Sequence, residues 1–274
     1  MGEVPVGAAR LTVAHGGPEH APSIVFVHAA IADHRSWLET MELLADDYRV
    51  VAYDRRGFGS TAYAPETHDQ TIDLMAVLDA LGIERCVLVG NSQGGRIALD
   101  ATLARPERVG GLVLVAPAVT GAPAASADDV GQEVAEIWAS LEAADKAGAL
   151  DALNLGEIRL WVDGPTAREG RVSGARRDLA LAMNARALSA ENPGYEPEPP
   201  DAWSRLGEVD VATVVMVGAL DLAHVRARSA IVAERIAGAR LEVIPQAAHL
   251  IALEQPDVAA AALTRFMGEL AATT

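Results

Sequence analysis

Cysteine is nearly absent from this sequence, and so are long apolar runs. The single cysteine, Cys86, excludes an intramolecular disulfide and a thiolate metal cluster, and a reducing compartment fits this content best. No stretch approaches the ~18 uninterrupted apolar residues that a membrane span requires, and the N-terminus has no cationic start followed by an apolar run. We therefore expect a cytoplasmic protein with no membrane partner.

Positive charge is also scarce. The 274 residues carry 38 acidic and 22 basic side chains, a formal net charge of −16, and the basic residues are scattered singly or in pairs. Such a chain repels phosphate backbones and anionic lipid headgroups. We expect no nucleic-acid partner; the expected partner is a small-molecule substrate, and the composition is compatible with a homodimer.

The sequence does contain a large apolar fraction arranged in two alternating patterns. Hydrophobic residues make up 50% of the chain, which is enough for a self-sufficient core. Short β-branched runs alternate with longer helical patterns, which predicts an α/β fold with a mostly parallel central sheet flanked by helices. The expected strands are 23–27, 48–53, 85–89, 111–115, 212–217 and 239–244, with 9–15 as an edge strand. The expected helices are 37–44, 71–81, 94–103, 224–236 and 257–270.

Strand patterns disappear between residues 118 and 210. This region is rich in alanine, favours helices over 130–150 and 176–188, and closes with a proline-rich stretch at 192–200. We interpret residues 119–208 as a helical cap inserted between two strands. The core would then consist of two parts, residues 1–118 and residues 209–274, with the cap lying over the strand ends.

A G-x-S-x-G pattern, Gly90 to Gly94, lies between an expected strand and an expected helix. A strand that turns directly into a helix forces the middle residue, Ser92, into a strained backbone conformation, and small residues two before and two after it let the turn close. The helix that follows aims its first amides at an anion formed there. Ser92 is therefore the candidate nucleophile.

A serine hydroxyl needs a base and an orienting acid, and both are expected at the exits of later strands. His249 follows the last expected strand, and Asp221 ends the segment 214–221. Parallel strands bring their exits to one edge of the sheet, where Ser92 also lies. We predict Asp221 and His249 as acid and base; His224, three residues after Asp221, is the rival base.

Acyl transfer also needs donors for the oxyanion. One is expected to be the backbone amide of Gln93, the residue after the nucleophile, and the second should come from residues 28–31, the loop after the strand 23–27.

Five segments together carry a resemblance to a known family. They are 26–30 (FVHAA), 53–60 (YDRRGFGS), 90–95 (GNSQGG), 217–221 (VGALD) and 248–250 (AHL). The chain resembles the α/β-hydrolase superfamily, in the branch of small lidded proteins that includes enol-lactone hydrolases, cofactor-free haloperoxidase-like esterases and meta-cleavage C–C hydrolases. The resemblance implies the α/β-hydrolase fold.

The resemblance also implies which amide is the second donor. It assigns this role to Ala30, with Ala29 as the alternative. Members of the family usually carry glycine after the histidine, so Ala29 is a departure, and its methyl group is expected to narrow the floor of the site. We expect His28 to fix this loop by hydrogen bonds.

No cofactor and no metal are expected. Residues 57–62 match G-x-G-x-x-A, but Pro65 follows almost at once, which leaves no helix to receive a pyrophosphate. We interpret 54–59 as a structural turn that borders the site. The sequence has no HExxH motif, Cys/His pair or EF-type loop.

The predicted cap supplies the candidates for substrate binding. These are Trp138, Trp161, Met183 and Asn184, each of which can alternatively pack the cap onto the core. The most basic patch of the chain consists of Arg168, Arg171, Arg176 and Arg177. We interpret this patch as a solvated helix face; the alternative is that it steers a carboxylate-bearing substrate.

These features predict a serine hydrolase that cleaves a small, moderately apolar carboxylic ester or lactone through an acyl-enzyme at Ser92. One alternative is a C–C bond hydrolase, because Gly-Asn-Ser at the turn resembles the meta-cleavage branch. The alternative from another class is a non-catalytic protein that binds a small ligand on the hydrolase fold. The intact set of Ser92, Asp221 and His249 favours an enzyme.

Overall fold

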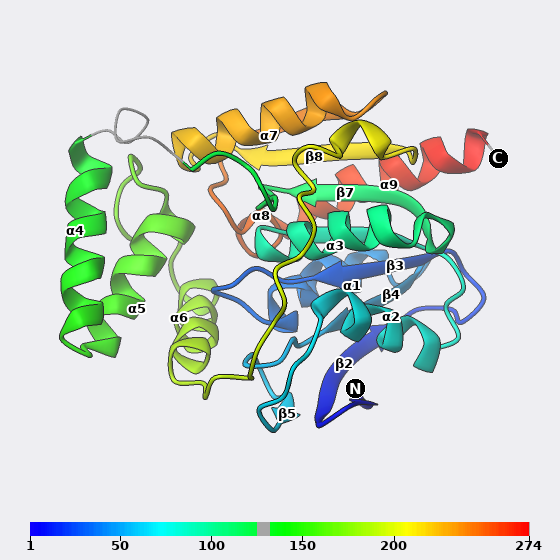
Figure 1. Ribbon diagram of the computed structural model, residues 1–274. Helices are drawn as coiled ribbons and strands as arrows, with labels where there is room; N and C mark the ends of the chain where they lie inside the picture. The colour runs from blue at the N-terminus through cyan, green and yellow to red at the C-terminus, as the bar shows by residue number, and fades with distance from the viewer. Residues whose placement is uncertain (125–131, 274) are drawn as a thin grey trace.

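The computed structural model describes residues 1–124 and 132–273, in which nine strands form a single sheet (Figure 1). The strands are β1 (Gly2–Val6), β2 (Ala9–Gly16), β3 (Ser23–Val27), β4 (Arg49–Tyr53), β5 (Ala62–Tyr63), β6 (Cys86–Asn91), β7 (Val109–Val115), β8 (Thr213–Gly218) and β9 (Arg240–Ile244). Their order is β1-β2-β4-β3-β6-β7-β8-β9, and β5 pairs with β2. Neighbours from β4 to β9 run parallel, as predicted, and the pairs made by β2 are antiparallel.

One strand prediction is wrong in its placement. The segment expected as an edge strand is β2, and it lies inside the sheet because β1 pairs with its outer side. In β1, Val4 is buried and Pro5 is exposed. Proline cannot donate a ladder hydrogen bond, which suits it to an edge strand. The true edge is therefore the short β1.

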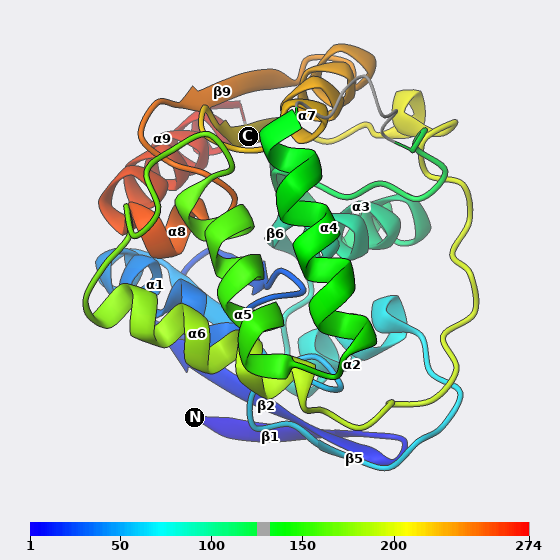
Figure 2. The ribbon, with the colours of Figure 1, turned by 90° about the vertical axis from the view of Figure 1, so that its left-hand side faces the viewer.

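Helices cover both faces of the sheet (Figure 2). One face is covered by α2 (Gln70–Ala80), α3 (Gln93–Ala104) and α7 (Ala223–Arg235). The other is covered by η1 (His34–Trp37), α1 (Leu38–Leu44), α8 (Ile251–Glu254) and α9 (Pro256–Thr273). Strands β3, β4, β6, β7 and β8 are buried along nearly their whole length, which explains why they read as continuous apolar runs.

The described residues between β7 and β8 include the segment predicted as the cap, and none of those described between 119 and 208 is in a strand. Residues 125–131 of the predicted cap, which include the start of the helix expected at 130–150, lie outside the described residues. The elements of the predicted cap are α4 (Gln132–Lys146), α5 (Leu150–Ile158), the π-helix η4 (Arg159–Asp163) and α6 (Ala175–Leu188), followed by the 3₁₀ turn η5 (Leu206–Glu208). The cap helices lie together at the end of the sheet toward which the parallel strands point (Figure 1). The helices expected at 130–150 and 176–188 correspond to α4 and α6, whereas α5 and η4 were not predicted.

Within the described residues, no helix has both the length and the apolar character needed to cross a membrane.

Candidate active site

The turn between β6 and α3 has the strained geometry predicted for a nucleophile elbow. Ser92 has φ 55° and ψ −115°, values that L-residues rarely adopt, and it is partly exposed. A Cβ atom on Gly94 would lie 2.1 Å from the carbonyl oxygen of Val27, and one on Gly90 would lie 2.2 Å from that of Gly94. Only glycine therefore allows the helix α3 to approach β3 this closely and begin directly at Ser92.

The predicted acid and base are in direct contact. Nδ1 of His249 lies 2.7 Å from Oδ2 of Asp221, and both side chains are buried. A carboxylate oxygen only accepts hydrogen bonds, so Nδ1 of His249 is the donor in this contact. The backbone N–H of Leu222 donates to the other oxygen of Asp221 at 2.7 Å. The rival base, His224, lies in the first turn of α7, while the Asp221 carboxylate is occupied by His249.

The side chain of Asn91 ties the elbow to the loop that carries His249. Its amide Nδ2 donates to the carbonyl oxygen of His249 at 3.1 Å and to that of Val115 at 3.0 Å. A Cβ atom on Gly218 would lie 2.1 Å from the carbonyl oxygen of Ala248, so glycine at the end of β8 lets the histidine loop come this close. The three predicted catalytic residues therefore belong to segments that touch one another.

A buried carboxylate, Glu254, holds the backbone on both sides of His249. The N–H of Ala248 donates to one Glu254 oxygen at 2.7 Å, and the N–H of Leu250 donates to the other at 2.9 Å. Arg171, from the cap, also donates to Glu254, and to the carbonyl oxygen of Gln246 at 2.8 Å. The loop that carries His249 is thus held by hydrogen bonds to Glu254 of α8 and to Arg171 of the predicted cap.

His28 has the structural role predicted for it. Its Nδ1 donates to the carbonyl oxygen of Ala29 at 2.8 Å, and its Nε2 accepts from the backbone N–H of Arg55 at 3.1 Å. Burial, together with the nearby Arg55 charge, lowers the pKa of His28 to about 3, so the ring is neutral at physiological pH. The ring is therefore a fixed hydrogen-bonding spacer beneath the loop.

The two alanines of this loop differ in exposure. Ala29 is buried in an apolar cluster with Ile31, Met183 and Leu250, whereas Ala30 is partly exposed. The Ala29 methyl group packs in this cluster against residues of the predicted cap, and its narrowing of the floor of the site stays a prediction. This difference favours Ala30 over Ala29 as the second oxyanion donor, opposite Gln93 at the start of α3.

Two of the four candidates for substrate binding form an aromatic pair against the predicted base. The Trp161 ring lies 4.6 Å from the His249 ring between centroids, and its carbonyl oxygen accepts the backbone N–H of His249 at 3.1 Å. Trp138, from α4, meets Trp161 edge to face at 6.1 Å. Trp161 belongs to the π-helix η4, an element type that is frequent at functional sites.

The other two candidates are buried inside the cap interface. Met183 is 1% exposed and packs in the apolar cluster with Ala29. Asn184, also 1% exposed, donates to Oδ1 of Asn154 at 3.0 Å and to Oε2 of Glu157 at 2.7 Å. These contacts favour the packing interpretation for both residues.

The interpretation of the basic patch as a solvated helix face is wrong for Arg171 and Arg177, because both pair with buried carboxylates. Arg171 pairs with Glu254, Arg176 with Glu39 at 2.6 Å and Arg177 with Asp163 at 2.8 Å. Two of these pairs join the cap to the core and the third lies within the cap. Arg168 is exposed.

A buried cluster of Asp33, His34 and Asp54 brings three possible metal-ligand atoms within 4.8 Å of one another. Each group already has a partner in the protein. Asp54 accepts from the backbone and the ring of His34 at 2.8 and 2.7 Å and from the N–H of Ser60 at 2.9 Å, and Asp33 pairs with Arg35 at 2.7 Å. These hydrogen bonds explain the cluster: its side chains support the turn at residues 54–59.

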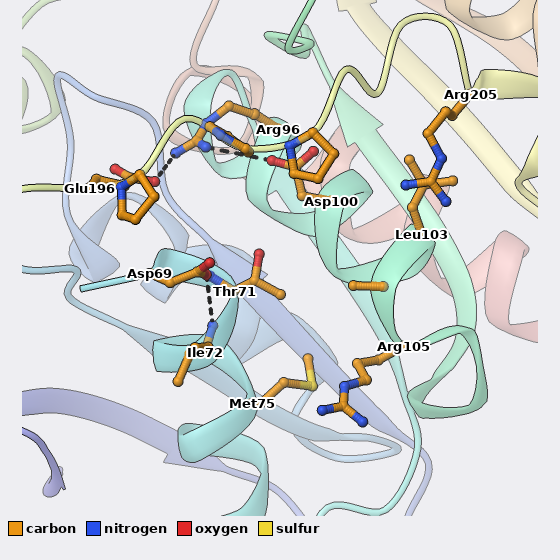
Figure 3. A pocket seen from close by; sticks show the side chains of 14 residues that line it. Asp69, Thr71, Ile72, Met75, Arg96, Asp100, Leu103, Arg105, Glu196 and Arg205 are labelled. Carbon is orange, nitrogen blue, oxygen red and sulfur yellow. Dashed lines mark hydrogen bonds and ion pairs between the residues drawn. The ribbon is translucent and has the colours of Figure 1, made fainter. Parts of the chain in front are cut away.

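A separate pocket of about 530 Å³ lies between α2, α3 and the segment that returns from the cap (Figure 3). Arg96 pairs with Glu196 of the returning segment at 2.9 Å and, more distantly, with the buried Asp100 at 3.5 Å. Burial raises the pKa of Asp100 to about 6. This network joins the first turns of α3, the helix that follows Ser92, to the segment that returns from the predicted cap.

Sequence reasoning missed the supporting roles of Asn91, Glu254 and Arg171. Asn91 lies in the motif 90–95, Arg171 lies in the basic patch, and Glu254 lies five residues after His249. These side chains bind backbone groups of distant segments, so no local sequence pattern predicts their supporting roles.

The mostly parallel sheet with helices on both faces defines a protein of the α/β-hydrolase fold class. A model of the alpha/beta hydrolase family matches residues 24–262. The chain belongs to this family, and the resemblance drawn from its motifs is confirmed.

Individual relatives are distant but cover nearly the full length. The 3-oxoadipate enol-lactonase 1 of Acinetobacter baylyi is 27% identical over 255 residues, 90% of this chain and 89% of that protein. A putative 2-succinyl-6-hydroxy-2,4-cyclohexadiene-1-carboxylate synthase of Bacillus subtilis is 26% identical over 280 residues, 94% of each chain. Among solved structures, Est816, described as an N-acyl homoserine lactone degrading enzyme, is 25% identical with a TM-score of 0.74, covering 96% of this chain and 99% of its own. Ester and lactone hydrolysis is thus supported at the level of the family.

Proposed function

We propose that this protein is a serine hydrolase that cleaves a small, moderately apolar carboxylic ester or lactone through an acyl-enzyme at Ser92. The observation that carries the proposal is the buried hydrogen bond of 2.7 Å between His249 and Asp221. Asn91, the residue before Ser92, donates to the backbone of that same histidine. A base with a fixed tautomer and a strained serine thus belong to one connected network.

In the proposed acylation step, Nε2 of His249 takes the proton of the Ser92 hydroxyl while Oγ bonds to the substrate carbonyl carbon. The carbonyl π electrons move to its oxygen, which becomes an oxyanion held by the backbone amides of Gln93 and Ala30. When this tetrahedral intermediate collapses, the C–O bond to the alcohol breaks, and the leaving oxygen takes the proton from His249. Asp221 stabilises the imidazolium throughout.

Deacylation repeats these steps with water. His249 takes a proton from the water molecule, the resulting hydroxide adds to the acyl carbon, and Ser92 leaves with the proton returned by the histidine. The carboxylic acid is released, and for a lactone the alcohol is part of the same product. The ring of Trp161 beside His249 offers an apolar wall to the substrate, which supports a moderately apolar acyl or alcohol group.

The relatives support the choice of bond. Two of those described above are named for lactones, an enol-lactonase and an enzyme that degrades N-acyl homoserine lactones. The synthase among them shows that the same scaffold also carries another reaction, so the bond must be tested directly.

The test combines covalent labelling with two substrates. A fluorophosphonate probe is expected to label the wild-type chain at Ser92 and to leave Ser92→Ala and His249→Ala unlabelled, with thermal stability nearly unchanged in both variants. A nitrophenyl ester should be hydrolysed and a vinylogous diketo acid, a substrate for C–C cleavage, should not. Absence of labelling in folded wild-type protein would favour a ligand-binding role, and turnover of the diketo acid alone would favour the C–C hydrolase.

A further inference from the structure

Arg55 is a deeply buried cation. Its side chain is 1% exposed, and burial lowers its pKa to about 10, so it remains protonated at neutral pH. Within the described part of the chain no ion pair involves Arg55, and its Nε has no hydrogen-bond partner. The next residue, Arg56, is equally buried but pairs with Asp73 at 2.7 Å and with Glu66 at 2.5 Å.

A charge buried without an opposite charge costs stability, because water solvates the guanidinium better than a protein interior does. Arg56 is explained by the two carboxylates that it joins. Arg55 has no such structural explanation. Glu196 attracts the Arg55 charge only from beyond ion-pair distance, and Arg96 repels it. Groups with perturbed pKa values cluster at functional sites, which directs attention to what the Arg55 guanidinium touches.

The guanidinium of Arg55 touches both segments that carry the proposed oxyanion donors. Its Nη2 donates to the carbonyl oxygen of Ala29 at 3.2 Å, and its Nη1 donates to Oε1 of Gln93 at 3.1 Å. The Phe58 ring lies against it at 4.3 Å and holds it in place. One planar group therefore joins the loop after β3 to the first residue of α3.

The contact at Ala29 has a direct consequence for Ala30. The carbonyl group of Ala29 and the N–H of Ala30 belong to one planar peptide unit. Two donors, the Arg55 cation and His28 at 2.8 Å, hold that carbonyl oxygen and fix the plane. A cationic donor also polarises the peptide, which makes the N–H on its other side a stronger donor.

We propose that Arg55 is a positioning residue of the oxyanion hole: it aligns the Ala29–Ala30 peptide with Gln93 and places a buried positive charge behind the developing oxyanion. This inference rests on the proposed function, and it concerns the step in which the carbonyl of an ester or lactone becomes tetrahedral. In a site that excludes water, such a charge acts on the transition state with little screening.

The test compares Arg55→Met and Arg55→Lys with Arg96→Met as a matched control. Arg96 is a partly buried arginine on the same helix as Gln93. It pairs with Asp100 and Glu196, and among the described residues its side chain makes no hydrogen bond to Ala29 or Gln93. The measurements are kcat and KM for a nitrophenyl ester, the inhibition constant of phenylboronic acid and the thermal midpoint. Ser92 Oγ bonds to the boron of phenylboronic acid while its proton passes to His249. The product is a tetrahedral boronate anion, which places a boron-bound hydroxyl group in the oxyanion hole.

Arg55→Met is expected to lower kcat and weaken phenylboronic acid binding by a similar factor, about 10–100-fold by analogy with supporting groups around metal ligands. KM should change less than about 3-fold, since ground-state binding does not use the charge. The thermal midpoint should stay the same or rise, because the buried charge is gone. Arg55→Lys keeps the charge but cannot reach both partners, so its values should lie in between. Arg96→Met should retain wild-type kcat.

Wild-type kcat in Arg55→Met would overturn the inference. So would a lower kcat accompanied by a lower thermal midpoint and unchanged boronate affinity, which is the signature of a purely structural residue. If Arg55→Met does not fold, Arg55→Lys decides: wild-type kcat and boronate affinity in that variant overturn the inference. Failure of the proposed function would give a different result: Ser92→Ala would then keep both the esterase activity and the fluorophosphonate labelling of the wild type.

Discussion

The side-chain amide of Asn91 donates a hydrogen bond of 3.1 Å to the backbone carbonyl oxygen of His249, 158 residues further along the chain. Asn91 precedes the proposed nucleophile, and His249 is the proposed base. The same amide also holds the carbonyl oxygen of Val115 at the end of β7. One buried side chain thus sets the spacing between two catalytic segments that share no secondary-structure element.

Replacement of Asn91 by aspartate should show how much this bridge contributes. The shapes are nearly equal, but an ionised carboxylate cannot donate, so both carbonyl groups lose their partner and face a negative charge. We expect kcat for a nitrophenyl ester to fall about 10-fold or more and the free energy of unfolding to fall by about 1–3 kcal/mol. Asn192→Asp is the control, since Asn192 is exposed and its side chain accepts from the N–H of Gly194, which a carboxylate can do equally well. Equal kcat and stability in Asn91→Asp and wild type would show that the bridge is dispensable.

The strain at Ser92 predicts an unusual order of stability. At φ 55° and ψ −115° a side chain is costly, so Ser92→Gly should be more stable than Ser92→Ala by about 1 kcal/mol in urea unfolding. The control is Ser140, exposed inside α4, where the order should reverse because alanine is the better helix former, by about 1 kcal/mol. If the alanine variant were more stable than the glycine variant at position 92 as well as at position 140, the elbow would not be strained.

Glu254→Gln should disturb the histidine loop. A carboxamide can accept from only one of the two backbone N–H groups beside His249, and it loses the charge that pairs with Arg171. We expect a loss of about 1–3 kcal/mol in unfolding free energy and a fall in kcat of about 10-fold. Glu39→Gln breaks the exposed cap-to-core pair with Arg176 and should cost at most about 1 kcal/mol, with kcat unchanged. A larger effect at Glu39 than at Glu254 would contradict this assignment.

The raised pKa of Asp100 predicts a pH-dependent gain in stability on its replacement. The pKa is about 6 in the folded protein against 3.8 ordinarily, so the folded state binds the proton more tightly and stability decreases as the pH rises from about 4 to 6. Asp100→Asn removes this penalty. The variant should gain up to about 3 kcal/mol more relative to wild type at pH 8 than at pH 4. Urea unfolding of variant and wild type at both pH values measures this difference in stability. An equal gain at the two pH values would show that Asp100 does not cause the loss of stability at high pH.

Much of the fold follows from local pattern. The strands at 23–27 and 49–53 lie within one residue of their expected bounds, because strands buried on both faces are continuously apolar. The strand β1 was missed, since it is short, half exposed and contains proline. The helix α5 and the π-helix η4 were missed inside an alanine-rich region in which helix boundaries have no strong end signals.

The candidate site divides in the same way. Ser92, Asp221 and His249 were predicted because each stands at a strand exit in a recognisable order, and parallel strands bring their exits to one edge. Arg55 and Arg56 are adjacent and chemically identical. Arg56 pairs with two carboxylates, whereas Arg55 forms an ion pair with none of the described residues. That distinction depends on which segments lie within hydrogen-bond distance of each guanidinium.

The sequence alone determined the alternation of strands and helices, the insertion of a cap and the identity of the elbow, because periodicity, turn geometry and chain order are local properties. Only the tertiary structure decided which residues support the site. Asn91, Glu254 and Arg171 act on backbone groups of distant segments. Backbone groups are chemically the same at nearly every position. Which side chain binds a given backbone group therefore depends on proximity in the folded chain, and the sequence alone does not predict it.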